Sequence, residues 1–264
     1  MHIYLRRLTA VALIALGLAT SGGASRAQSN VPVVAAASDL QAAIEEVAAA
    51  FKKETGMEVR LSMGSTGNFA RQIREGAPFQ IFMAADENFI RDLHRDGFTR
   101  DEGELYALGR VVIMVPHGST LKADGNLDTL AAALEAGEIE RFAIANPEHA
   151  PYGMRAEEAL KHKGIWETLQ PHVVLGENVS QAAQFALSGN AQGGIIAYSL
   201  ALAPNIRDLG TFELIPEDWH QPLRQRMALL KGAGPVAEAF YSYINSAEAR
   251  AIMERYGFVL PEAD

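Results

Sequence analysis

The 264-residue sequence contains no cysteine, which excludes disulfides, thiol chemistry and cysteine-bound metal. It also leaves no cysteine that could carry a lipid anchor, so we expect the exported chain to be untethered. A chain without crosslinks depends on its hydrophobic core, and 48% of these residues are hydrophobic. The length therefore predicts one large domain or two smaller ones.

Long apolar runs are also scarce, and the only one lies near the start. Arg6 and Arg7 precede apolar and small residues from Leu8 to Thr20, and small residues continue toward Ala27. This order is typical of a secretory signal peptide cleaved after Ala27. The run is too short to cross about 30 Å of hydrocarbon, which takes roughly 20 residues. We therefore predict a signal peptide at residues 1–27 and export to the periplasm.

Positive charge is in the minority, with 23 Lys and Arg against 32 Asp and Glu and a net charge of −9. Removal of residues 1–27 takes away three arginines and changes the net charge from −9 to −12. Such a chain has no general attraction for nucleic acid or anionic membranes. Any anion site must therefore depend on local geometry.

Motifs of metal and nucleophilic catalysis are missing as well. The seven histidines form no HExxH motif or paired cluster, so a protein-bound zinc site is not expected. The segment from Gly64 to Gly67 lacks the lysine of a phosphate-binding P-loop, and no GxSxG elbow occurs. We expect no nucleophile paired with a base, and the sequence predicts a protein that is not an enzyme.

What the sequence does contain is a regular alternation of short apolar strands and amphipathic helices. This alternation predicts an α/β fold with mostly parallel sheets flanked by helices. The predicted strands lie at residues 31–37, 59–63, 79–83, 111–115, 142–145, 173–175, 195–198 and 227–230.

Four of the predicted helices begin directly after short loops of Ser, Thr, Gly or Asn. These loops lie at Ser38, at Ser65-Thr66, at Tyr152-Gly153 and at Val179-Ser180. Ser38 is expected to cap its helix, and residues 64–68 are expected to form a loop before the next one. Each helix start has free backbone N–H groups and roughly half a positive charge, so several together could bind an anion without a cationic side chain.

These loops and several neighbouring segments, in their order along the chain, are similar to segments of a known protein family. The sequence resembles periplasmic molybdate-binding proteins of the molybdate ABC transporter, which belong to the type II periplasmic binding proteins. The segments that carry the resemblance are Ala35-Ala36-Ala37-Ser38-Asp39-Leu40, Gly64-Ser65-Thr66-Gly67 with Ala70-Arg71-Gln72-Ile73 and Gly76-Ala77-Pro78, Ile81-Phe82-Met83-Ala84-Ala85-Asp86, Asn146-Pro147-Glu148-His149-Ala150-Pro151-Tyr152-Gly153, Glu177-Asn178-Val179 and Arg255-Tyr256-Gly257-Phe258.

The resemblance implies two lobes with the ligand in the cleft between them. Lobe I would hold residues 30–108 and 226–264, and lobe II would hold residues 109–225. The protein would be a monomer without a cofactor. It would capture molybdate or tungstate and deliver the oxyanion to the membrane permease of an ABC transporter.

The resemblance also implies which residues bind the oxyanion. They are Ser38, the N–H of Asp39, Ser65 and Thr66 from lobe I, with the N–H groups near Tyr152 and Val179 from lobe II. Some family members use a tyrosine from a later strand, but Tyr198 is displaced here by one position, so the hydroxyl is assigned to Tyr152. Asp39 departs from members with an apolar residue, and its carboxylate is expected to point away from the anion.

Simpler roles and rival functions remain open. Ser38 could be an ordinary cap, Ser65-Thr66 an ordinary turn, and Tyr152 a packing residue. Molybdate is a full dianion and suits a site of donors, whereas protonated phosphate needs an acceptor, which an inward-facing Asp39 would provide. The rivals are a binding protein for another oxyanion such as sulfate or for a metal–anion pair, a sensor domain, and a secreted enzyme acting on small phosphate esters.

Overall fold

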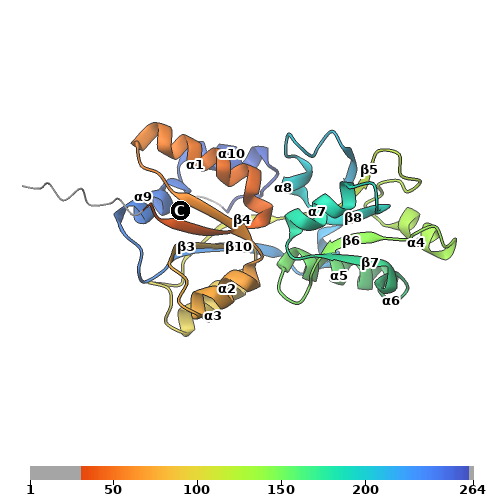
Figure 1. Ribbon diagram of the computed structural model, residues 1–264, viewed down its shortest axis with the longest axis horizontal. Coiled ribbons are helices and arrows are strands. Elements are labelled where there is room, and N and C mark those ends of the chain that lie inside the picture. Colours follow the sequence, from red (N-terminus) through yellow and green to blue (C-terminus); the bar gives the residue numbers. More distant parts are fainter. Residues whose placement is uncertain (1–30, 262–264) are drawn as a thin grey trace, which may run out of the picture. The chain divides into compact units, whose positions relative to one another are not determined.

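The computed structural model describes residues 31–261, so the predicted signal peptide at residues 1–27 lies outside the described part. Residue 30 and residues 262–264, which belong to the predicted lobe I, lie outside it as well. The described residues form two five-stranded sheets flanked by helices (Figure 1). Among them, no helix combines the length and the apolar character needed to cross a membrane.

The first sheet has the strand order β2-β1-β3-β10-β4. Its strands are β1 (Val33–Ala37), β2 (Arg60–Gly64), β3 (Phe79–Ala84), β4 (Glu104–Gly109) and β10 (Leu223–Leu229). The second sheet has the order β7-β6-β8-β5-β9. Its strands are β5 (Val111–Pro116), β6 (Phe142–Ala145), β7 (Val173–Gly176), β8 (Gly193–Ala197) and β9 (Gly210–Leu214).

Helices follow most of the strands. The α-helices are α1 (Gln41–Thr55), α2 (Thr66–Arg74), α3 (Glu87–Arg95), α4 (Asp128–Glu135), α5 (Pro151–Lys163), α6 (Trp166–Leu169), α7 (Val179–Leu187), α8 (Tyr198–Ala201), α9 (Pro235–Tyr243) and α10 (Ala247–Arg255). Short 3₁₀ helices occupy η1 (Ser38–Leu40), η2 (Gln170–His172) and η3 (Glu217–Trp219).

The first sheet is covered on both faces, because alternate residues of a strand point to opposite sides. Val34 and Ala36 of β1 pack in one core with α1, α9 and α10, whereas Ala35 packs in another with α2 and α3. Figure 1 shows these two groups of helices on opposite faces of the sheet. Burial on both sides explains why β1 is a continuous apolar run.

The prediction of mostly parallel sheets is confirmed, with one antiparallel strand in each sheet. In the first sheet β1 pairs in parallel with β2 and β3, but β10 is antiparallel to β3 and β4. The second sheet has the same mixture, because β5 is antiparallel to β8 and β9. The antiparallel members β5 and β10 are the strands that the chain enters after leaving the other sheet.

The chain passes between the sheets twice, from β4 to β5 and from β9 to β10. β10 begins at Leu223, a few residues before the predicted return to lobe I at residue 226. β4 and β9 are two strands that were not predicted from the sequence. The lobe limits themselves, 30–108 with 226–264 and 109–225, stay a prediction.

Two local predictions are wrong. α2 begins at Thr66, so Gly67 and Asn68 lie inside the helix rather than in a loop before it. Tyr198 opens the short helix α8 instead of ending a strand. Gly67 and Asn68 are residue types common in loops, whereas Tyr198 directly continues the apolar run of β8, so neither helix start has a clear local signal.

Candidate functional site

A small pocket lies between the two sheets, where strands end and helices begin. Its volume is about 10 Å³, enough for about one water molecule. It is lined by Ala37, Ser38, Asp39, Gly64, Ser65, Thr66, Ala85, Ala150, Pro151, Tyr152 and Val179. The structure thus brings all six predicted site residues to one place, although their role in binding stays a prediction.

A larger groove of about 680 Å³ runs between α1 and α7. Its walls include Glu45, Glu46 and several apolar side chains such as Leu187 and Ile206. Two carboxylates repel an anion, so the small pocket with its hydroxyls is the better candidate for an anion site.

Ser38 begins η1, which leads directly into α1. The N-cap position belongs to Ala37 and no side chain caps the helix, so the prediction that Ser38 is a cap is wrong. The Ser38 hydroxyl instead accepts a hydrogen bond from the Ser180 N–H at 3.3 Å, and the Ser180 hydroxyl donates to the Ser38 carbonyl at 2.9 Å. Among the described residues, no acceptor takes the proton of the Ser38 hydroxyl, which leaves it available to a ligand.

Ser65 and Thr66 lie at the start of α2. The Thr66 hydroxyl accepts from the Ala85 N–H at 3.1 Å, which ties α2 to the end of β3. The Ser65 hydroxyl lies 2.9 Å from Nδ1 of His149, and the Gly67 N–H donates to the His149 carbonyl at 2.9 Å. Position 67 must be glycine for this approach, because a Cβ there would lie 2.7 Å from the His149 carbonyl oxygen.

The Ser65–His149 contact corrects the expectation that no nucleophile is paired with a base. The two residues are 84 positions apart, so no sequence spacing could reveal the pair. Within residues 31–261, no carboxylate bonds the other ring nitrogen of His149. The pair therefore lacks the third group that orients the base in a Ser-His-Asp arrangement.

The second sheet contributes the starts of α5 and α7. Tyr152 lies in the first turn of α5 behind Pro151, and Val179 is the first residue of α7. The Asn178 side chain caps α7 by accepting from the Gln181 N–H at 3.0 Å. Both helices present free N–H groups and the positive end of their dipole toward the pocket.

The Asp39 side chain forms the most buried polar cluster of the site. It is 1% exposed, and its Oδ2 accepts from the Gln225 amide at 2.6 Å and from the Tyr152 hydroxyl at 3.1 Å. The same amide donates to the Tyr152 oxygen at 3.1 Å. Asp39 Oδ1 is buried without a hydrogen-bond partner among the described residues. The carboxylate thus contacts Tyr152, one of the predicted site residues, and its direction relative to an anion stays a prediction.

Burial raises the pKa of Asp39 from 3.8 to about 7, although the hydrogen bonds from Gln225 and Tyr152 oppose the shift. Burial, together with the nearby Asp39, raises the pKa of Tyr152 and of Tyr106 well above 10. Both tyrosines are therefore neutral hydroxyl groups at physiological pH.

Gln225 and Tyr106 are the members of this cluster that the sequence analysis missed. The Tyr106 hydroxyl donates to Gln225 Oε1 at 2.7 Å, which turns the amide nitrogen toward Asp39. A signal was present, because Gln225 alternates with Leu223 and Met227 on the buried face of β10. A lone amide on an apolar strand face must find partners, and here these partners are at the site.

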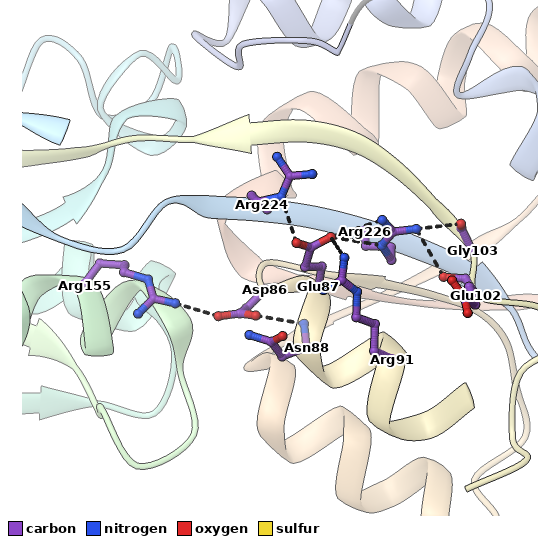
Figure 2. A network of polar contacts seen from close by, with 9 residues as sticks. All are labelled: Asp86, Glu87, Asn88, Arg91, Glu102, Gly103, Arg155, Arg224 and Arg226. Carbon is purple, nitrogen blue, oxygen red and sulfur yellow. Dashed lines mark hydrogen bonds and ion pairs between the residues drawn. The ribbon is translucent and has the colours of Figure 1, made fainter. Parts of the chain in front are cut away.

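Next to the pocket, an ion-pair network joins α3, α5 and β10 (Figure 2). Arg155 of α5 binds Asp86 at 2.6 Å, and both side chains are at least nine-tenths buried. Asp86 also caps α3 by accepting from the Asn88 N–H at 2.9 Å. Glu87 binds Arg224 at 2.8 Å and Arg226 at 3.1 Å, and these bonds and charges lower its pKa. The sequence analysis does not predict the Arg155 contact.

Tyr198 is not part of the pocket lining. Its ring packs against Phe212 of β9 with the ring centres 5.9 Å apart. Residues 31–261 contain no group of three or more His, Asp or Glu side chains that could hold a metal ion.

The chain is similar to known proteins over nearly all of its described length. A family model for bacterial extracellular solute-binding proteins matches residues 32–259. The molybdate-binding protein ModA of Rhodobacter capsulatus is 33% identical over 95% of this chain and 94% of its own. ModA of Azotobacter vinelandii is 34% identical over 90% of this chain and 93% of its own.

Solved structures show the same similarity. The periplasmic molybdate-binding protein of Azotobacter vinelandii matches with a TM-score of 0.76 at 30% identity, covering 88% of this chain and 100% of that chain. The sulfate-binding protein SubI of Mycobacterium tuberculosis matches with a TM-score of 0.71 over 88% of this chain and 87% of its own, but at 17% identity it shares only the fold.

Proposed function

Because the chain belongs to the bacterial extracellular solute-binding proteins, and within them to the family of ModA molybdate-binding proteins, we propose that it captures molybdate or tungstate. The observation that carries the proposal is the single pocket formed by four helix starts, two from each sheet. The ligand is a tetrahedral oxyanion bound through its oxygens, with no protein atom on the metal.

The chemistry of the pocket supports an anion with full negative charge. Its lining offers the hydroxyls of Ser38, Ser65, Thr66 and Tyr152 and the N–H groups of helix starts, and it contains no cationic side chain. A buried dianion must be fully hydrogen-bonded, and neutral donors achieve this inside an acidic protein. The narrow pocket would open for entry and close around the anion as the sheets move relative to each other.

The remaining parts of the proposal concern the setting. The protein would be exported through its predicted signal peptide, act in the periplasm as a monomer, and deliver the oxyanion to the permease of an ABC transporter. Its relatives named ModA support this assignment. It would act as a carrier and not as an enzyme.

Calorimetry of the mature protein with molybdate, tungstate, sulfate and phosphate tests the proposal. We expect saturable one-to-one binding of molybdate and tungstate. Tight binding of sulfate or phosphate without heat from molybdate would overturn the assignment and favour the rival oxyanion.

The Ser38→Ala variant tests the location of the site. Loss of one hydrogen bond to a charged ligand should weaken molybdate binding by about 1–3 kcal/mol. Ser242→Ala, on the exposed side of α9, is the matched control and should bind like the wild type. Thr66→Ala should weaken binding to a similar extent, but it also leaves the buried Ala85 N–H without its acceptor, so Ser38 gives the cleaner test. Equal affinity of Ser38→Ala and the control would place the anion elsewhere.

Because Ser65 contacts His149, the rival function of a secreted enzyme acting on small phosphate esters needs its own test. An enzyme would release phosphate from a phosphate ester, and His149→Gln would abolish that release. We expect no release by the wild type, because the pair has no orienting acid within the described residues.

A further inference from the structure

We infer that Asp39 couples anion binding to proton uptake, because the Asp39–Tyr152 pair can offer a donor to the anion only when the carboxyl group carries a proton. The inference rests on the proposed function and concerns how pH regulates anion binding at that site. It follows from counting protons in the buried cluster.

The ionised form of Asp39 leaves no donor for a ligand. A tyrosine hydroxyl has one proton, and the Tyr152 proton points to Asp39 Oδ2. The two amide protons of Gln225 point to Asp39 Oδ2 and to the Tyr152 oxygen. The remaining carboxylate oxygen, Oδ1, carries only lone pairs and makes no hydrogen bond to a side chain of the described residues.

One added proton changes this balance. A proton on Oδ2 can be donated to the Tyr152 oxygen, which frees the Tyr152 proton for the anion. A proton on Oδ1 adds a second donor to Asp39, a residue that lines the pocket. Protonation also removes a negative charge that would repel a dianion in a buried site.

The surroundings of Asp39 favour such a switch at physiological pH. Burial raises the pKa of Asp39 to about 7 against the opposing effect of its hydrogen bonds, and a neighbouring dianion would raise it further. The other titratable groups facing it are Tyr106 on β4 and Tyr152 on α5, which both stay neutral. Arg155 on α5 binds Asp86 and Glu158 instead.

His149 is the one further titratable group at the pocket within the described residues, through its contact with Ser65. A variant of His149 is therefore compared with the Asp39 variant.

The test is calorimetric titration of the full mature protein with molybdate between about pH 6 and about pH 8, in buffers of different ionisation enthalpy. The wild type should take up close to one proton per anion at the upper pH, and its Kd should rise about tenfold across this range. In Asp39→Asn the amide oxygen can take the place of Oδ2 and accept from Gln225, while the amide nitrogen takes the place of Oδ1 and is a permanent donor, so its Kd should change by less than about twofold. Its affinity at the upper pH should exceed that of the wild type.

Two control variants sharpen the result. His149→Gln should retain the tenfold pH dependence. Glu45→Gln removes a carboxylate from the exposed face of α1 and should retain it too.

The inference is overturned if the wild type takes up no proton, or if the pH dependence disappears in His149→Gln and persists in Asp39→Asn. It is also overturned if the wild type binds phosphate through Asp39 as an acceptor and Asp39→Asn loses that binding. An absence of molybdate binding at every pH, in the wild type and in Asp39→Asn alike, would instead overturn the proposed function.

Discussion

At the scale of single residues, the site is defined by polar side chains on otherwise apolar faces. Asp39 and Gln225 are both almost completely buried, and each satisfies part of the other's hydrogen-bonding capacity. A buried charge without full pairing is unfavourable, and Asp39 Oδ1 has no partner within residues 31–261. Ionised Asp39 therefore carries an electrostatic penalty that lowers the stability of the fold.

This penalty predicts a pH-dependent effect of Asp39→Asn on stability. A carboxyl pKa raised from 3.8 to about 7 stabilises the fold below pH 3.8, and this contribution is lost as pH rises through 7. The upper bound is about 4 kcal/mol at about 1.4 kcal/mol per pKa unit. The asparagine side chain stays neutral at every pH, so the variant should melt higher than the wild type at about pH 8, with a smaller advantage near pH 5.

Thermal unfolding of the anion-free proteins at these two pH values measures the difference. Glu45→Gln is the control, because it removes an exposed carboxylate and should change little at either pH. An Asp39→Asn variant that melts lower than the wild type by the same amount at both values would show that the buried carboxylate carries no electrostatic penalty.

At the scale of elements, the Arg155–Asp86 pair joins α5 to the N-cap of α3 (Figure 2). Removal of one partner from a buried pair leaves an uncompensated charge, so Arg155→Met should destabilise the protein by about 3–5 kcal/mol. Arg95→Met is the control, because Arg95 and Asp92 form an exposed pair on α3. That pair should contribute only about 0–1 kcal/mol.

Urea unfolding of both variants gives the comparison. Similar shifts of the midpoint in Arg155→Met and Arg95→Met would contradict a buried ion pair between these helices.

How much the sequence could reveal differs between elements. The apolar run of β6 predicts a strand at residues 142–145, where the structure has it, because a strand buried on both faces has a clear local signature. β4 was missed because its polar and apolar residues, from Glu104 to Gly109, make a short mixed pattern. The antiparallel insertion of β10 was missed because pairing between distant strands leaves no local trace.

The site shows the same division. Helix starts are local features, so four loops could be proposed as an anion site, and the family resemblance assigned to them six of the residues that line the pocket. The partners that decide the state of Asp39 come from 113 and 186 positions away, at Tyr152 and Gln225. Neither the direction of the Asp39 carboxylate nor the Arg155–Asp86 pair follows from spacing in the sequence.

At the scale of the whole described chain, the pocket is formed by residues that follow strands of both sheets. The Ser38–Ser180, Gly67–His149 and Asn68–Glu177 contacts each join one helix start or loop to another across the pocket. The small pocket volume corresponds to this closed arrangement. Substitutions at such contacts should act on closure and leave each sheet intact.

Gly67→Ala is the sharpest probe of closure. The added Cβ would lie 2.7 Å from the His149 carbonyl oxygen, which is backbone and cannot turn aside. Inside α2 an alanine is favourable, so the first sheet with its helices should remain folded. We therefore expect molybdate affinity to fall at least about tenfold, the equivalent of about 1.4 kcal/mol, while the melting temperature without anion changes little. Gly232→Ala, where a Cβ meets open space, is the control and should bind normally. A Gly67→Ala protein that binds as tightly as this control would mean that the anion does not require the Gly67–His149 contact.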